Sequence, residues 1–138
     1  FNVFGPNQNP DSPYSGVLSI ITDKLKNNET FNLYGDGSQT RDFVYVADVV
    51  KALRLVATKT PHATVYNVAQ GGETSLLDLI KMYEKVTGKK LKIKKMPARN
   101  GDITKSVADI SKIKSIGFKP DWPLERGLKA YWKYETRK

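Results

Sequence analysis

Short segments with strand character alternate with longer segments of helical periodicity, and this alternation limits the architectures open to the chain. Apolar residues at helical spacing predict helices, and short β-branched or aromatic runs between turn residues predict strands. Such alternation is typical of α/β domains, in which helices cover a sheet. The expected strands span 1–4, 31–34, 43–46, 65–68 and 91–96, and the expected helices span 15–28, 48–57, 75–88, 110–116 and 124–135.

Two local signals set the ends of these elements. The run 35–38 (Gly-Asp-Gly-Ser) predicts a turn between two strands. Ser75 is a good N-cap with Asp78 three residues later, and Gly88 is suited to end the same helix. No repeat or low-complexity linker divides the chain, so we expect residues 1–138 to form one domain.

Composition excludes several classes of site. The chain has no cysteine, which rules out disulfides and thiolate metal sites and suits a reducing cytoplasm. Its one histidine, His62, is expected in a solvated loop, so we predict no metal site. No apolar run approaches the roughly 20 residues that cross a bilayer. These features predict a soluble, cytoplasmic protein without membrane contact.

The net charge of +9 raises the question of a nucleic-acid partner. The densest basic run, 89–95, alternates Leu91 and Ile93 with lysines, which predicts a strand with one buried and one solvated face. Nucleic-acid-binding domains usually interleave basic residues with exposed aromatic residues, and this run does not. The pattern disfavours nucleic acid, although most of the charge stays unexplained and a non-catalytic basic binding module remains an alternative.

Three polar side chains stand in loops of the kind that bind ligands in α/β proteins. Arg41 follows the glycine-rich turn, and Arg99 and Asp102 lie in the loop 97–102. A guanidinium can donate two parallel hydrogen bonds to a phosphate, so two arginines suit a diphosphate, and Asp102 suits a ribose hydroxyl. On residue types alone, each is equally compatible with an ordinary surface loop.

Three segments then indicate a family. Residues 1–6 (FNVFGP), 34–46 (YGDGSQTRDFVYV) and 109–112 (DISK) resemble, in order and spacing, the distal half of extended short-chain dehydrogenases/reductases that act on nucleotide sugars. The thirteen-residue segment is the most specific, because it mixes glycine, charged and aromatic types. The resemblance spans essentially the whole chain. It implies the substrate-binding C-terminal part of an extended Rossmann-type protein, without its dinucleotide-binding half.

The resemblance implies substrate contacts for five residues in the first part of the chain. Asn2 is expected beside the sugar diphosphate near the nicotinamide. Gly16 and Val17 are expected to open the helix beneath the uracil, and Asn32 and Tyr34 to flank the base or its ribose.

For the loops, the resemblance agrees with the residue chemistry. It implies that Arg41 and Arg99 bind the diphosphate and that Asp102 accepts hydrogen bonds from the ribose hydroxyls. The sequence departs from the family at Asn7, where many relatives have arginine.

The family's hydride transfer needs a glycine-rich dinucleotide turn and a Tyr-x-x-x-Lys pair, and the chain has no convincing example of either. Gly35 and Gly37 lack the third glycine of the turn. Tyr134 and Lys138 have the pair's spacing, but they fall at the end of the last expected helix. We therefore predict no catalytic and no cofactor-binding residue. Because the chain also opens on Phe1, we expect an inactive fragment of a longer enzyme.

The activity implied by the resemblance is that of an NAD-dependent UDP-glucose or UDP-N-acetylglucosamine 4-epimerase. NAD is expected to be bound mainly by the missing half, and the full-length protein to be a homodimer that binds a UDP-sugar. A dTDP-glucose 4,6-dehydratase or a UDP-glucuronate decarboxylase is the alternative, because these enzymes share most of the three segments.

Overall fold

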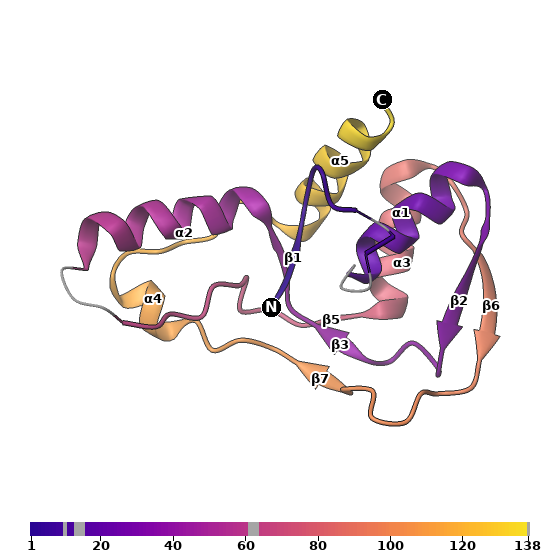
Figure 1. The fold of residues 1–138 in the computed structure, drawn as a ribbon, viewed down its shortest axis with the longest axis horizontal. Coiled ribbons are helices and arrows are strands. Elements are labelled where there is room, and N and C mark those ends of the chain that lie inside the picture. The colour runs from indigo at the N-terminus through magenta and orange to yellow at the C-terminus, as the bar shows by residue number, and fades with distance from the viewer. Residues whose placement is uncertain (10, 13–15, 61–63, 138) are drawn as a thin grey trace.

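The computed structural model describes residues 1–9, 11–12, 16–60 and 64–137. The expectations for Ser15, His62 and Lys138 fall outside these ranges. Within them helices and strands alternate along the chain (Figure 1). In chain order the elements are β1 (Asn2–Phe4), α1 (Val17–Asn27), β2 (Thr30–Tyr34), β3 (Thr40–Arg41), β4 (Phe43–Tyr45), α2 (Val46–Lys59), β5 (Thr74–Ser75), α3 (Leu76–Thr87), β6 (Lys92–Met96), β7 (Lys105–Ser106), α4 (Ser111–Ser115) and α5 (Leu124–Glu135).

In the described part of the chain, the strands form three small sheets. β1 pairs with β4 and β2 pairs with β6, and both pairs are parallel. The third sheet has the order β5-β3-β7, in which β5 is antiparallel and β7 parallel to β3. Parallel pairs need long crossover connections, and here these connections contain the helices. The result is a mixed α/β fold.

The larger hydrophobic core lies where α1, α3 and α5 meet β2 (Figure 1). α1 contributes Leu18, Ile21 and Leu25, which recur at helical spacing and are nearly inaccessible to solvent. Tyr83 of α3 is fully buried and its hydroxyl lies 2.8 Å from Thr22 Oγ1, so its polar atom is satisfied inside the core. This core fixes α1 beside β2, which matters for the site below.

A second, smaller core lies between α2 and α4 (Figure 1). Ala52 of α2 and Ile113 of α4 are fully buried there, together with Phe118. Tyr66 and Val68 pack against this cluster, whereas Val65 is 82% exposed. The segment 65–68 thus keeps the period-two alternation of a strand, but none of the described strands pairs with it, and the predicted strand there is wrong.

Two fully buried carboxylates flank β4 and connect it to distant parts of the chain. Asp42 accepts hydrogen bonds from the backbone N–H groups of Gln70 (3.0 Å), Gly71 (2.9 Å) and Ala108 (3.4 Å). Because buried polar groups need partners, these bonds hold two distant chain segments against one side chain.

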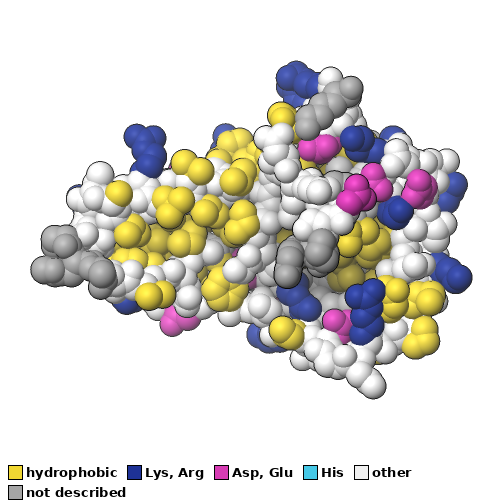
Figure 2. Space-filling view, viewed as in Figure 1, with side chains coloured by type: hydrophobic (Ala, Val, Ile, Leu, Met, Phe, Trp, Pro, Cys, Tyr) yellow, Lys and Arg dark blue, Asp and Glu magenta, His cyan; other side chains and the backbone are white. Residues whose placement is uncertain are grey.

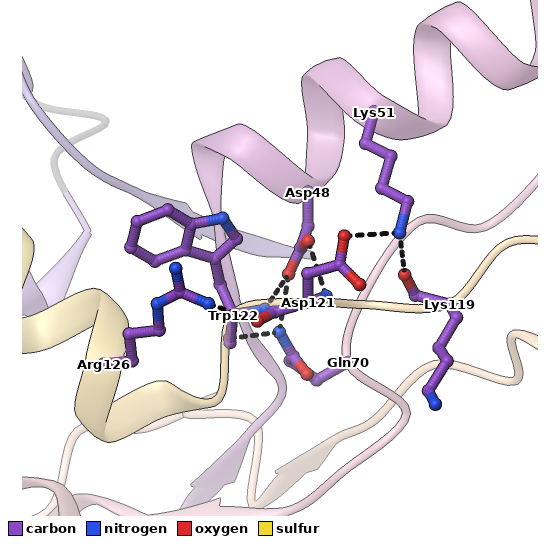
Figure 3. Close-up of polar contacts among 7 residues, drawn as sticks. All are labelled: Asp48, Lys51, Gln70, Lys119, Asp121, Trp122 and Arg126. Atoms are coloured by element: carbon purple, nitrogen blue, oxygen red, sulfur yellow. Dashed lines mark hydrogen bonds and ion pairs between the residues drawn. The ribbon is translucent and has the colours of Figure 1, made fainter.

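Asp48, in the first turn of α2, also connects distant chain segments through buried hydrogen bonds (Figure 3). It accepts from the backbone N–H groups of Asp121 (2.9 Å) and Trp122 (3.1 Å) and from Gln70 Nε2 (3.1 Å). The segment that leads into α5 is therefore held to the start of α2.

Two other expectations need correction. The helix predicted from Asp48 begins at Val46, directly after β4, so that Asp48 lies inside its first turn. The strand predicted at 91–96 forms as β6, but its expected buried face is wrong, because Leu91 is buried just before the strand while Ile93 is 41% exposed. β6 lies at one end of the molecule (Figure 1).

Candidate functional site

A pocket of about 400 Å³ opens between α1, β2 and the segments that follow β2 and β6. Its lining combines an apolar floor with three cationic and one anionic side chain. The lining residues are Val17, Ile20, Lys24, Thr30, Phe31, Asn32, Tyr34, Gln39, Arg41, Phe43, Leu76, Arg99 and Asp102. Concave sites of this size with a few polar groups on an apolar wall are typical of small-molecule binding.

The pocket brings together six of the eight substrate-contact residues predicted from the sequence, namely Val17, Asn32, Tyr34, Arg41, Arg99 and Asp102. The other two lie nearby without lining it. Gly16 is the N-cap residue of α1, directly before Val17. Asn2 donates from Nδ2 to the carbonyl oxygen of Asp42 at 3.2 Å, beside Arg41 in sequence. The roles assigned to all eight residues remain predictions.

Arg41 is held rigidly at the pocket wall. Its strand β3 lies between β5 and β7, and Thr40 N–H donates to Thr104 O at 2.8 Å. The guanidinium Nη1 donates to the carbonyl oxygens of Thr40 (2.8 Å) and Ile103 (2.7 Å). One nitrogen is thereby committed to the protein, which leaves the remaining donors of the planar group for an anion.

Arg99 stands on the exposed loop that follows β6. Its guanidinium carbon lies 3.6 Å from the centroid of the Tyr34 ring, which is a close cation–π contact. The start of the loop is tied to the turn after β2, because Gly35 N–H donates to Met96 O at 3.0 Å. Its end is turned by the bond from Asp102 N–H to Arg99 O at 3.3 Å, so that the Asp102 carboxylate lines the same pocket.

Sequence reasoning missed part of the lining. Ile20 and Lys24 lie three and seven residues after Val17, on one face of α1, and helical spacing alone points to them. Thr30 shares a face of β2 with Asn32, as period two requires. These signals exist in the sequence, but they become useful only once Val17 and Asn32 are known to face a cavity.

Lys24 adds a third positive charge to the pocket. It forms an ion pair with Glu29 at 2.5 Å, and this hydrogen bond is the main cause that raises the pKa of Lys24 above its ordinary value. The side chain therefore stays protonated at neutral pH. Because its charge is paired with that of Glu29, the groups that make the pocket attractive to an anionic ligand are chiefly Arg41 and Arg99.

The buried tyrosines are poorly suited to proton transfer at neutral pH. Burial raises the pKa of Tyr83 far above its ordinary value and that of Tyr131 to about 12. Tyr134, the tyrosine with the Tyr-x-x-x-Lys spacing, donates its hydroxyl to Asn7 Oδ1 at 2.8 Å. None of these three lines the pocket.

Two features are absent from the described ranges. No group of three or more His, Asp or Glu side chains is arranged to hold a metal ion there. No helix in these ranges is long and apolar enough to span a bilayer.

Comparison with known proteins identifies the family. The model of the NAD dependent epimerase/dehydratase family matches residues 1–69, half of the chain. The chain belongs to this family. The matched half holds α1, β2 and β3, and therefore most of the pocket lining, whereas Arg99 and Asp102 lie beyond it.

Relatives of this epimerase/dehydratase chain extend the match to nearly its full length. It is 38% identical over 128 residues to a putative UDP-glucose 4-epimerase of Methanocaldococcus jannaschii, which covers 93% of the chain and 41% of the relative. It is 31% identical over 129 residues to a dTDP-L-rhamnose 4-epimerase of Burkholderia thailandensis, with 92% of the chain and 36% of the relative covered. The chain thus spans about two fifths of the length of such relatives.

Solved structures of family members have the same fold over this part. A UDP-N-acetylglucosamine 4-epimerase of Methanobrevibacter ruminantium, in complex with UDP-N-acetylmuramic acid, superposes with a TM-score of 0.91 at 38% identity. The UDP-glucose 4-epimerase of Thermotoga maritima, with UDP-glucose, superposes with a TM-score of 0.90 at 36% identity. Each match covers 99% of the chain and 44% of the other structure. The chain is thus a partial homologue of nucleotide-sugar 4-epimerases.

Proposed function

We propose that the chain is the C-terminal, substrate-binding part of an NAD-dependent 4-epimerase that acts on UDP-glucose or UDP-N-acetylglucosamine. The observation that carries the proposal is the pocket, in which Arg41, Arg99 and Asp102 stand together over an apolar floor. Two guanidinium groups suit a diphosphate and the carboxylate suits ribose hydroxyls, while the strand β2 and the apolar residues of α1 suit a flat base. Relatives that are complexed with UDP-sugars support this choice.

The role assigned to this chain is to keep the substrate bound during the reaction. When bound, NAD supplies the oxidation and reduction at C4 of the sugar. Gly35 and Gly37 do not fit the dinucleotide turn that holds such a cofactor, because they lead into the two-residue strand β3 instead of opening a helix. The chain's own residues hold the diphosphate by charge-assisted bonds, which keeps the ligand attached while its sugar changes orientation.

The first test is UDP binding to the chain, measured by isothermal titration calorimetry. We expect Arg41→Ala and Arg99→Ala each to raise the Kd for UDP at least about tenfold, since a charge-assisted hydrogen bond contributes roughly 1.5–3 kcal/mol. Arg126→Ala is the matched control, because Arg126 also stacks on an aromatic ring, that of Trp122 at 4.0 Å, but lies outside the pocket. Unchanged affinity in both pocket variants would remove the diphosphate site from the proposal.

Two further comparisons separate the alternatives. Binding of one UDP by two arginines predicts a shallow dependence on salt, whereas a basic binding module for polyanions predicts a steep loss of affinity between low and moderate salt. Preference for dTDP over UDP would instead favour a thymidine-linked substrate, like that named for the Burkholderia relative. The expected homodimer of the full-length protein remains a prediction.

The longer enzyme is also expected to cover an apolar stripe on α2. Val50 is 50% and Leu53 64% exposed, although Ala52 between them is fully buried in the smaller core. α2 is therefore apolar on two sides, as expected of a helix with neighbours on both. Figure 2 shows hydrophobic side chains gathered on the lobe that contains α2 and α4. We assign this face to contact with the NAD-binding part.

For the isolated chain this face predicts self-association. We expect sedimentation velocity to show concentration-dependent oligomers, and Val50→Glu with Leu53→Glu to shift the protein to the 15.5 kDa monomer. Ser115→Glu with Thr136→Glu is the matched control, because it adds the same charge at exposed polar positions. A wild-type chain that stays monomeric at every concentration would contradict the assignment.

A further inference from the structure

The two pocket arginines are held in different ways. Arg41 is fixed by carbonyl oxygens, those of Thr40 and Ile103. In the ranges that the structure describes, the Arg99 side chain has no hydrogen bond or ion pair, and its close contact is the face of the Tyr34 ring at 3.6 Å. The Tyr34 ring thus orients the guanidinium of Arg99, as the two carbonyl oxygens orient that of Arg41.

The loop that carries Arg99 is tied down at its two ends, and between them its described hydrogen bond is the one from Asp102 N–H to Arg99 O at 3.3 Å. Before it, Gly35 N–H donates to Met96 O, and after it, Arg41 Nη1 donates to Ile103 O. Residues 97–102 are exposed, and Gly101 has a positive φ of 81°. The stack on the Tyr34 ring is therefore the side-chain contact that fixes the direction of the Arg99 guanidinium.

Tyr34 is well placed to serve as a support. It is the last residue of β2, it is paired in register with Met96 of β6, and it is half-buried. Its backbone is thus set by the sheet, and a tyrosine ring has few rotatable bonds of its own. A free arginine side chain samples many rotamers, so stacking it before the ligand arrives lowers the entropy cost of binding.

We propose that Tyr34 is a positioning residue for Arg99: its ring holds the guanidinium over the pocket, ready to bind the diphosphate of a nucleotide-sugar. The inference rests on the proposed function and deepens it, because it separates the residue that orients the cation from the residue that binds the anion. The attraction resides in the ring face, so the Tyr34 hydroxyl is dispensable.

A double-mutant cycle tests the proposal by calorimetric titration of the chain with UDP. Tyr34→Leu is expected to raise the Kd about 3- to 10-fold, the range of a partly exposed cation–π contact, and Tyr34→Phe to leave it within about 2-fold of wild type. In the Arg99→Met background, Tyr34→Leu is expected to have a clearly smaller effect, because only the direct contact of the ring with the base or its ribose is then lost. Tyr66→Leu is the matched control, because Tyr66 contacts Lys112 at 5.0 Å, away from the pocket, and its loss should leave the Kd unchanged.

Nuclear magnetic resonance of the ligand-free chain gives a readout that does not depend on UDP. The δ-methylene protons of Arg99 are expected upfield, through the ring current, in wild type and Tyr34→Phe but not in Tyr34→Leu. Unshifted protons in wild type overturn the proposal, as does an equal loss of affinity from Tyr34→Leu with and without the Arg99 side chain. Absence of UDP binding to wild type with the upfield shift present overturns the proposed function and leaves the positioning of Arg99 established.

Discussion

Asp48→Ala is expected to lower the free energy of unfolding by about 3–5 kcal/mol, because it removes the acceptor of several buried hydrogen bonds at once. Asp48 is fully buried, and its two carboxylate oxygens accept from Asp121 N–H, Trp122 N–H and Gln70 Nε2. Without it the N–H groups of Asp121 and Trp122 lose their acceptor, and the segment that leads into α5 loses its buried connection to α2 (Figure 3). Urea denaturation followed by circular dichroism measures the change.

Lys51→Met is the control for this prediction. Lys51 Nζ lies 2.5 Å from Asp121 and 2.7 Å from Lys119 O, in the same cluster as Asp48. Its side chain is 40% and that of Asp121 54% exposed, so the pair is screened by water and contributes about 0–1 kcal/mol. If Lys51→Met lowers the free energy of unfolding as much as Asp48→Ala does, the surface ion pair, and not the buried carboxylate, connects α2 to the segment before α5.

The sequence predicted the elements whose signals are local. α3 begins after Ser75, whose Oγ accepts from Asp78 N–H, and ends at Gly88 in the left-handed conformation, as its capping residues indicate. The segment 65–68 was misassigned because strand formation depends on a partner elsewhere in the chain, which composition does not report. The division of the strands into three small sheets was not foreseen for the same reason.

The site shows the same limit. Arg41, Arg99 and Asp102, which line the pocket, were predicted from their residue types in loops together with the family resemblance. The burial of Asp42 and Asp48 and their role in connecting chain segments were not predicted, since nothing in the adjacent sequence distinguishes them from surface aspartates. Lys24 was missed because its relevance depends on how α1 packs beside β2, which is decided by the larger core.

Gly37→Ala is the second substitution for which we expect a large effect, about 2–5 kcal/mol of destabilisation. Gly37 has a φ of 80°, which costs an L-residue roughly 1–2 kcal/mol. A Cβ at this position would lie 2.7 Å from Leu77 Cγ, so Leu77 or the turn has to shift, and overpacking of this kind costs about 1–3 kcal/mol more. The turn joins Tyr34 to Arg41, so UDP affinity is expected to fall together with stability.

Two other glycines separate backbone strain from steric clash. Gly88 has a φ of 68° but open space around its Cβ position, so Gly88→Ala is expected to cost only the strain, about 1–2 kcal/mol. Gly72 has open space and no positive φ, and Gly72→Ala is expected to be neutral or to stabilise by up to about 1 kcal/mol, through the unfolded state. If Gly37→Ala costs no more than Gly88→Ala, Leu77 yields without cost and the turn is held by its backbone conformation alone. A cost well above that of Gly88→Ala instead means that the packing of Leu77 of α3 against the turn helps to set the position of Arg41 in the pocket.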